Sequence, residues 1–219
     1  MIRMGLTGGI AAGKSVASRC LTAHGIPVID YDQLSRQVVA PGSRGLAAVV
    51  STFGQTVLAP DGSLDRRLLG TKVFADEQSR ERLEEIIHPL VISQAAILDA
   101  EIEANGATMI VHDIPLLVEV AGPEAFDVVA VVDAPAEVRM RRLVEQRAMT
   151  VEQAWDRIDS QIADQDRLAA ADVVWDGSGT IEQLCDQIEA WLAQVEQTGV
   201  HYRPDQERTN FLVTEDWSD

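Results

Sequence analysis

A phosphate-binding loop near the amino terminus is the part of the sequence that most directly indicates chemistry. Residues 8–15 read Gly-Gly-Ile-Ala-Ala-Gly-Lys-Ser and match the pattern G-x-x-x-x-G-K-[ST]. In this pattern backbone N–H groups turn toward phosphate oxygens, the lysine reaches the β- and γ-phosphates, and the final hydroxyl binds Mg²⁺. Ser15 is therefore the predicted magnesium ligand. The predicted nucleotide-binding residues run without a gap: Gly8, Gly9, Ile10, Ala11, Ala12, Gly13, Lys14, Ser15 and Val16.

The sequence around this loop supports the same interpretation. Residues 1–6 are predicted to form a short buried strand, and residues 14–23 form a helix with one apolar face. A strand, a glycine loop and a helix in this order aim a helix N-terminus at an anion. Of the 18 lysines and arginines, only Lys14 and Lys72 are lysines. The loop position therefore has the compact ammonium group that it requires, in a chain that otherwise uses arginine.

Composition indicates an ordinary intracellular domain. The chain has 219 residues, 46% of them hydrophobic, which suits one domain with an inserted lobe. Its net charge of −17 argues against nucleic-acid binding, and no apolar run reaches the length of a membrane span. No signal-peptide pattern precedes the first strand. We expect a cytoplasmic protein in which Cys20 and Cys185 are buried free thiols.

Short apolar segments alternate with helical ones along the chain. This order predicts an α/β fold of the P-loop NTPase type, with a doubly wound, parallel, five-stranded sheet. The expected strands are residues 1–6, 26–29, 108–112, 126–132 and 173–175.

Two helical insertions interrupt this alternation. The predicted core comprises residues 1–32, 105–137 and 171–199, and a helical substrate lobe spans about 33–104. A second insertion, about 138–170, is rich in arginine, and residues 200–219 form a tail without periodicity. Helices are expected at 33–39, 44–53, 66–73, 79–104 (kinked or split at Pro89) and 180–194.

Carboxylates follow two of the expected strands. Asp30 and Asp32 come directly after the second strand, where ligands of open α/β sheets bind. One could accept a proton from an attacking hydroxyl or hold Mg²⁺, and the other could cap the next helix. We expect Asp32 to be the catalytic one. Asp113, after the third strand, could face the metal or a second substrate, or belong to a plain turn before Pro115.

The arginines between residues 139 and 167 allow two interpretations. They could form an exposed helix face paired with acidic neighbours such as Glu137 and Glu145. They could also belong to a mobile lid that neutralises the transferred phosphate and excludes water. Beside a phosphate-binding loop, the lid interpretation is preferred for Arg141 or Arg147.

Together these motifs resemble the dephospho-CoA kinase family, from residue 1 to about 195. The phosphate loop alone would fit many kinases, but its combination with the later motifs is much narrower. The segments that carry the resemblance are 5–15 (Gly-Leu-Thr-Gly-Gly-Ile-Ala-Ala-Gly-Lys-Ser), 28–32 (Val-Ile-Asp-Tyr-Asp), 38–42, 83–89 (ending in His-Pro), 113–117 (Asp-Ile-Pro-Leu-Leu) and 171–172.

The resemblance implies transfer of the γ-phosphoryl group of ATP to the ribose 3′-hydroxyl of dephospho-CoA, the last step of coenzyme A biosynthesis. It implies a lobe for dephospho-CoA, a lid, and no partner among nucleic acids or membranes; we expect a monomer. By position, Asp32 is the general base and Lys14 and Arg141 are catalytic. Arg147 joins the ATP site, and Arg142 also falls in the lid. Dephospho-CoA is assigned to Asp32, Arg80, His88, Asp113 and Leu116.

The sequence departs from the family pattern at three places. Ala11 and Ala12 stand where Gly-Ser is common, and Tyr31 stands where alanine is common. Gly177 stands where many members have an asparagine that helps to read the adenine, which leaves the nucleotide preference open.

Two other functions remain as alternatives. A nucleoside- or shikimate-type kinase would share the loop, but the helical insertion with His88-Pro89 argues against it. A nucleotide switch would need no strand-end base such as Asp32, and the chain lacks an Asn-Lys-x-Asp motif.

Overall fold

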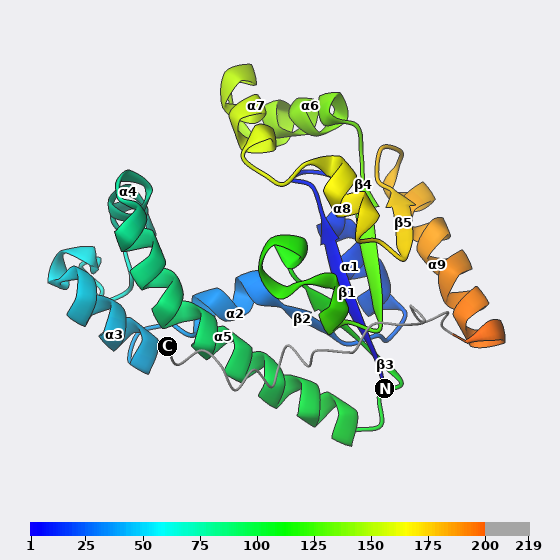
Figure 1. Cartoon of the computed structure of the whole chain (residues 1–219), viewed down its shortest axis with the longest axis horizontal. Coiled ribbons are helices and arrows are strands. Elements are labelled where there is room, and N and C mark those ends of the chain that lie inside the picture. Colours follow the sequence, from blue (N-terminus) through cyan, green and yellow to red (C-terminus); the bar gives the residue numbers. More distant parts are fainter. Residues whose placement is uncertain (200–219) are drawn as a thin grey trace. The chain divides into compact units, whose positions relative to one another are not determined.

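The computed structural model describes residues 1–199 of the chain, without the side chains of Phe74 and Ala75. Its centre is a five-stranded parallel sheet with the strand order β2-β3-β1-β4-β5 (Figure 1). The fold class expected from the sequence is therefore confirmed. The strands are β1 (Ile2–Gly8), β2 (Val28–Asp30), β3 (Met109–Asp113), β4 (Val128–Asp133) and β5 (Val173–Asp176).

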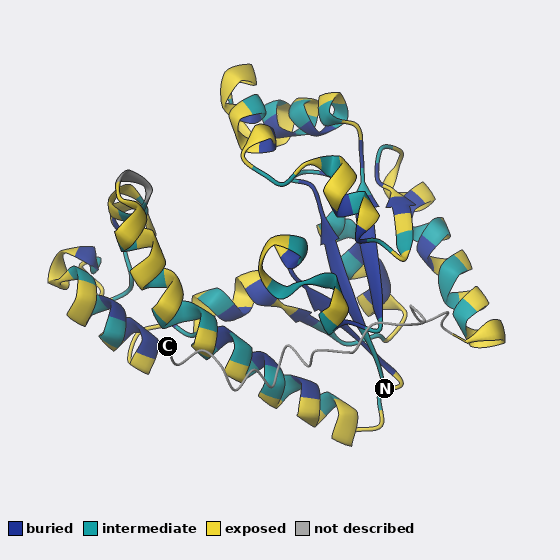
Figure 2. Cartoon of the chain, viewed as in Figure 1, coloured by how far each residue is buried: buried dark blue, intermediate teal, exposed yellow. Residues whose placement is uncertain are grey.

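The parallel strands are connected by crossover segments that contain helical elements, and the centre of the sheet is apolar. All five residues of β3 are buried, as are the first five of β4 (Figure 2). Helices α1 (Lys14–Ala23) and α9 (Ile181–Thr198) pack on one face and bury Leu21, Leu184 and Ile188 against it. This apolar layer holds the end of β1, and so the start of the phosphate loop, in a fixed place.

Most helix boundaries follow recognisable capping residues. Asp30, Ser43 and Asp65 each accept a hydrogen bond from the third residue of the helix that follows. Thr150 and Thr180 form capping boxes. The remaining α-helices are α2 (Tyr31–Gln37), α3 (Arg44–Phe53), α4 (Arg66–Ala75), α5 (Glu77–Ala104), α6 (Ala136–Arg147), α7 (Val151–Asp159) and α8 (Asp164–Ala169). Short 3₁₀ helices are η1 (Gln55–Val57) and η3 (Pro123–Ala125), and η2 (Leu117–Ala121) is a π-helix.

Two expectations about the helices need correction. Helix α5 runs through Pro89 as one element of 28 residues, so the proline does not split it. Helix α2 begins at Tyr31 rather than at residue 33, because Asp30 caps it immediately after β2. Within residues 1–199, no helix is long and apolar enough to cross a membrane.

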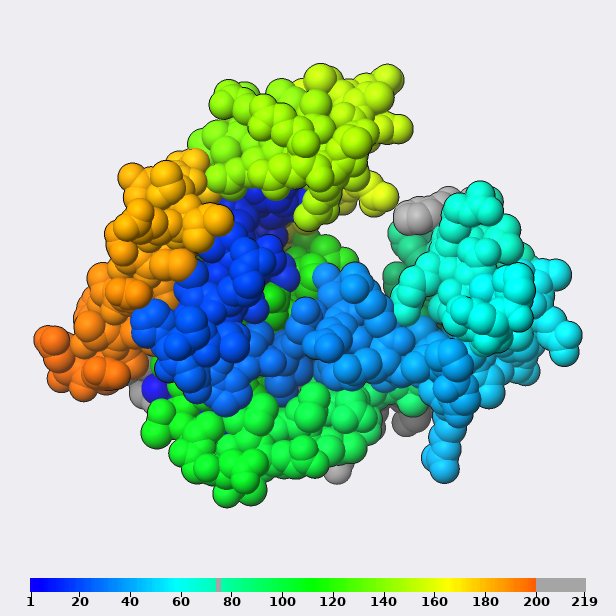
Figure 3. Space-filling view, turned by 180° about the vertical axis from the view of Figure 1, so that it is seen from behind, coloured from blue at the N-terminus to red at the C-terminus, as the bar shows by residue number. Residues whose placement is uncertain are grey.

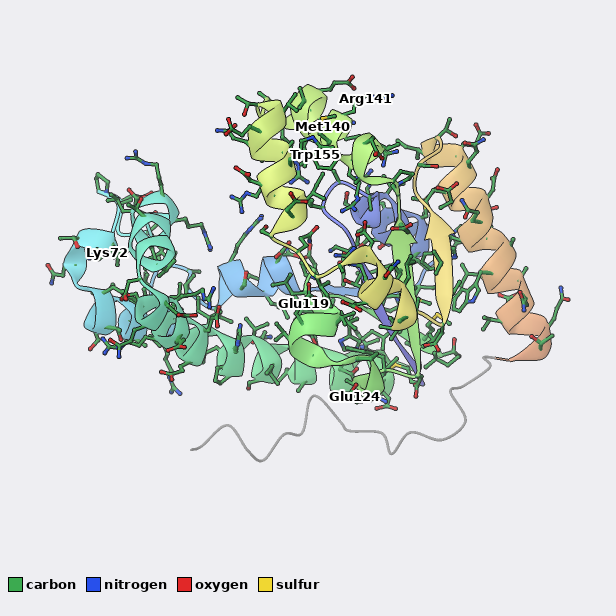
Figure 4. All side chains as sticks on the ribbon, turned by 45° about the horizontal axis from the view of Figure 1, so that its top comes forward. Lys72, Glu119, Glu124, Met140, Arg141 and Trp155 are labelled. Atoms are coloured by element: carbon green, nitrogen blue, oxygen red, sulfur yellow. A yellow bond between two sulfur atoms is a disulfide. The ribbon has the colours of Figure 1, made fainter. Side chains whose placement is uncertain are left out.

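The chain divides into two compact units. Among the described residues, the first unit comprises 1–29 and 102–199, and the second comprises 30–101. The second unit has its own apolar core, which includes Val39, Val49 and Leu69. In that unit Lys72 donates a hydrogen bond to the carbonyl oxygen of Phe53 at the end of α3 (Figure 4), so the second lysine has a structural contact. The predicted division into core, substrate lobe and lid stays a prediction, and the tail at 200–219 lies outside the described residues.

The two cysteines form a disulfide, so the expectation of free thiols is wrong. Cys20 on α1 is bonded to Cys185 on α9, with the two Cα atoms 5.7 Å apart. The two helices lie side by side (Figure 3). The prediction rested on the usual redox state of a cytoplasmic protein. It could not include the distance between two residues that lie 165 positions apart in the sequence.

We predict that reduction of this disulfide lowers the thermal stability of the protein. Native disulfides typically contribute about 2–4 kcal/mol, largely by restricting the unfolded chain. For a chain of this size, such a loss corresponds to a decrease in Tm of about 4–16 °C. Calorimetry with and without dithiothreitol measures it. A variant with both Cys20→Ala and Cys185→Ala is the control, because its Tm should not respond to dithiothreitol. Two titratable thiols and an unchanged Tm in the wild type would contradict the prediction.

Candidate active site

The phosphate loop connects β1 to α1 and has the backbone that its motif requires. Gly13 forms the N-cap of α1 with φ at +125°, a conformation that L-residues with side chains rarely adopt. Lys14 and Ser15 therefore lie in the first turn of α1, where the helix N-terminus favours anions. Ala11 also has a positive φ, +60°, at a position where the family commonly has a smaller residue.

Lys14 contacts a carboxylate that the sheet delivers from β3. Its Nζ atom forms an ion pair with Asp113 Oδ1, and Asp113 is only 5% exposed. Asp113 lies opposite Leu6 in the parallel register of β1 and β3. The Thr7 hydroxyl donates to the carbonyl oxygen of Pro115 at 3.1 Å, which fixes the turn after Asp113 beside the loop. The first unit therefore pairs the loop cation with a strand-end carboxylate, a contact that the sequence analysis did not predict.

A cavity of about 520 Å³ opens next to the loop. Ser15, Arg19 and Arg147 line it, together with the loop that follows β5 and the first turn of α9. Arg147 thus lies at a cavity beside the loop, and its place in the ATP site stays a prediction. Because the cavity adjoins the loop, it can hold the base and ribose of a nucleotide whose phosphates bind at the loop.

Gly177 is closed to any side chain in this structure. A Cβ atom built at Gly177 would lie 2.0 Å from the carbonyl oxygen of Ala12. The backbone of the loop after β5 therefore approaches the phosphate loop more closely than an asparagine would permit. Backbone groups, rather than a side chain at this position, are available to a base in the cavity.

Arg142 joins these two loops through their carbonyl oxygens. Its Nη1 atom donates to Ala11 and Ala12 at 3.1 Å each, and its Nη2 atom donates to Gly177 at 2.7 Å. The resemblance placed Arg142 in the lid. It does belong to α6, but its guanidinium group holds the backbone on which the nucleotide would lie.

Helices α6 and α7 form a small packed pair against the phosphate loop. Leu143 and Ala154 are fully buried between them, with Met140 and Trp155 at the edge (Figure 4). Ile10 packs on the same cluster. Arg141 is exposed on α6, labelled in Figure 4, and its catalytic role stays a prediction.

In the second unit, Asp30 and Asp32 divide the two roles considered for them. Asp30 accepts a hydrogen bond from the backbone N–H of Gln33 at 2.9 Å and is the N-cap of α2. Asp32 is exposed in the first turn of that helix. Tyr31, the residue between them in the sequence, is buried. Its burial, and secondly the negative charge of Asp99, raise the pKa of Tyr31 above its ordinary value. A buried Tyr31 anchors the turn that presents Asp32 to solvent.

The residues assigned to dephospho-CoA lie in both units. In the second unit Arg80 is exposed on α5 and pairs with Glu77 at 3.3 Å, and His88 is half-buried two turns further along the same helix. In the first unit Leu116 is 45% exposed, which is unusual for a leucine so near a buried strand. An exposed apolar side chain beside Asp113 suits contact with an organic substrate.

Sequence reasoning did not identify three residues that support the loop. Thr7 gives no signal beyond its place in an apolar strand, and Gln161 belongs to no motif. Gln161 Oε1 accepts a hydrogen bond from the backbone N–H of Ile10 at 2.7 Å. Arg142 was visible as one arginine among several, but nothing in its spacing indicated that it binds carbonyl groups.

We predict that glycine affects stability differently at the two alanines of the loop. Ala11→Gly removes the strain of a positive φ, worth about 1 kcal/mol, and adds backbone entropy of similar size, so stability should hardly change. Ala12→Gly is the matched control, since Ala12 is buried and lacks a positive φ. It should lose about 1–2 kcal/mol. Urea unfolding measures both, and an Ala11→Gly variant as unstable as Ala12→Gly would contradict the assigned backbone.

We also predict that Arg142→Met weakens ATP binding. Hydrogen bonds to a charged group contribute about 1.5–3 kcal/mol, so loss of the bridge should raise the Kd by about 10–100-fold. Isothermal titration calorimetry measures the Kd. The control is Arg157→Met, because Arg157 is exposed on the neighbouring helix α7. Equal affinities of the two variants would show that the bridge does not shape the site.

Comparison with known proteins gives one family. The dephospho-CoA kinase family model matches residues 2–183. The dephospho-CoA kinase of Cutibacterium acnes is 50% identical over 190 residues, which cover 86% of this chain and 82% of that protein. The dephospho-CoA kinase of Corynebacterium glutamicum is 42% identical over 195 residues, covering 89% of this chain and all of that protein.

Solved structures agree with this result at the level of the fold. The protein TT1252 from Thermus thermophilus has a TM-score of 0.74 and 29% identity, covering 89% of this chain and 97% of its own. Dephospho-CoA kinase from Campylobacter jejuni has a TM-score of 0.66 at 23% identity, covering 89% and 98%. Shikimate kinase from Acinetobacter baumannii shares the fold at a TM-score of 0.52. With the phosphate loop, its lysine and the strand-end carboxylate in place, this chain belongs to the dephospho-CoA kinase family, transferases that catalyse the final step of coenzyme A biosynthesis.

Proposed function

We propose that this chain transfers the γ-phosphoryl group of ATP to the ribose 3′-hydroxyl of dephospho-CoA, with Asp32 as the general base. The observation that carries the proposal is the Lys14–Asp113 ion pair at the phosphate loop, beside the cavity. Phosphoryl transfer requires mainly positioning and charge stabilisation, and this arrangement offers both at one edge of the sheet.

The nucleotide side of the reaction is assigned to the loop from Gly8 to Val16. Its backbone N–H groups bind the phosphates, and Lys14 stabilises charge on the β- and γ-phosphate oxygens. The exposed hydroxyl of Ser15 and the carboxylate of Asp113 are oxygen donors, which suit Mg²⁺. Bound Mg²⁺ would neutralise charge on the phosphate groups. Arg147 at the cavity and Arg141 on α6 are the lid cations of the proposal.

On the acceptor side, Asp32 removes the proton from the 3′-hydroxyl as its oxygen attacks the γ-phosphorus, and ADP leaves. Three features of the second unit support this role. Asp32 lies in the first turn of α2, two residues after the end of β2, it is exposed, and Asp30 already supplies the helix cap. Arg80, His88, Asp113 and Leu116 are proposed to contact dephospho-CoA. We place this reaction in the cytoplasm and expect a monomer.

A different acceptor is the main alternative, because shikimate kinase shares the fold. The two functions differ in the hydroxyl group that receives phosphate, and they share the loop. An acceptor panel therefore separates them, whereas ATP binding alone does not.

We predict that ADP forms from ATP and Mg²⁺ with dephospho-CoA, and not with AMP, adenosine or shikimate. Asp32→Asn should lower kcat by about 10²–10⁴-fold, the usual contribution of a general base, while the Kd for ATP is retained. A coupled assay for ADP measures turnover, and calorimetry measures ATP affinity.

Asp30→Asn is the matched control for this experiment. Asparagine caps helices about as well as aspartate, so this variant should keep wild-type turnover. Turnover with another acceptor would leave the fold unchanged and contradict the substrate. A normal kcat in Asp32→Asn would remove Asp32 from the role of base.

A further inference from the structure

Arg139 is a buried arginine that the proposed reaction does not use. It lies in the first turn of α6 and is only 1% exposed. Its Nε atom donates to the carbonyl oxygen of Ala134 at 2.9 Å, and its Nη2 atom forms an ion pair with Asp164. The third nitrogen, Nη1, is buried and has no hydrogen-bond partner in the structure. A guanidinium group with one unpaired nitrogen is costly to bury.

The unused nitrogen lies against the phosphate loop. A Cβ atom built at Gly9 would be 2.6 Å from Arg139 Nη1, which is closer than real side chains pack. Gly9 therefore leaves room for the guanidinium group behind the loop. Because Nη1 is buried, it does not contact a nucleotide directly in this conformation, and any effect on phosphate passes through the loop or through the electric field.

Asp164 holds a second buried arginine in addition to Arg139. Arg167 is 2% exposed and donates from Nη1 to Asp164 Oδ1 at 2.7 Å, and from Nη2 to the carbonyl oxygen of Ile162 at 3.1 Å. The cluster of Arg139, Asp164 and Arg167 thus contains two cations and one anion. This cluster therefore carries a net positive charge.

The same chain segment is attached to the loop a second time. Gln161, three residues before Asp164, accepts the hydrogen bond from the N–H of Ile10. The segment 160–164 connects α7 to α8. It therefore bonds to Ile10 directly, and through Asp164 it holds Arg139, which lies behind Gly9. Arg139 has a defined position because the cluster and the carbonyl group of Ala134 fix it from both sides.

We propose that Arg139 is a positioning residue of the phosphate loop: its buried cation supports the loop at Gly9 and strengthens binding of the phosphate groups of the nucleotide. The inference rests on the proposed nucleotide site. A positive charge in the low-dielectric interior acts on a polyanion at the loop, and it acts little on the uncharged base and ribose. Its contribution should therefore increase with the number of phosphate groups on the ligand.

The test compares the binding of ATP, ADP and adenosine by calorimetry on the full-length chain. In Arg139→Met the cluster becomes neutral, while Asp164 keeps Arg167 as its partner. In Arg139→Lys the charge remains and the planar fork is lost. In Asp164→Asn both arginines remain without the anion, so the net positive charge of the cluster increases. The ion pairs through which residue 164 joins Arg139 to Arg167 are weakened at the same time. Each variant is measured below its own Tm.

We expect Arg139→Met to weaken ATP binding by about 10–100-fold, as for removal of one nearby charge at an effective dielectric constant near 20, and to leave adenosine binding within a factor of about two. ADP should fall between them. Arg139→Lys should keep most of the preference for ATP over adenosine, and Asp164→Asn should keep or increase it.

Two outcomes would overturn the inference. If Arg139→Met and Asp164→Asn weakened ATP and adenosine by the same factor, the cluster would be a structural bridge only. If Arg139→Met kept the wild-type preference for ATP, the buried charge would have no role in phosphate binding. A wild-type protein that bound ATP no better than adenosine would instead contradict the proposed function itself, so the two failures are distinguishable.

Discussion

The carbonyl groups of the phosphate loop need hydrogen-bond donors, and this requirement shapes much of the first unit. A peptide group that turns its N–H toward an anion turns its C=O to the opposite side, where an unpaired buried oxygen is unfavourable. Arg142 supplies donors to two such oxygens in the loop and to a third in the loop after β5. The five donors of one guanidinium group can bind several carbonyls that a lysine would reach one at a time.

This constraint explains why α6 lies where it does. Its arginines can reach behind the loop only if the helix packs directly on it, and Leu143 and Ile10 form that contact. Helix α6 therefore combines two functions that sequence analysis separated. It belongs to the expected lid, and it also supports the floor of the nucleotide site. Because α6 is attached to the loop at its base, its position can respond to what the loop binds.

The sequence predicted features that depend on local order and missed those that depend on distant partners. The strand, loop and helix at residues 2–23 and the five strands follow from short patterns, because apolar runs and glycine positions reflect local burial. The Arg142 contacts join residues about 130 positions apart, and no periodicity encodes them. The disulfide was missed for the same reason. The prediction used the usual redox state of cytoplasmic cysteines, because the distance between Cys20 and Cys185 cannot be known from the sequence. Pro89 was expected to kink or split its helix, but α5 continues through it as one element.

The disulfide also turns most of the kinase into a covalent ring. Cys20 and Cys185 close a loop with a sequence separation of 165, which contains β2 to β5 and every helix from α2 to α8. A force applied at the two chain ends would pass through the sulfur–sulfur bond and would not extend the enclosed segment. At about 3.3–3.6 Å per residue, the fully extended length of the oxidised chain would be shorter than that of the reduced chain by roughly 550 Å. The phosphate loop, at residues 8–15, lies outside the ring and would remain exposed to the pull.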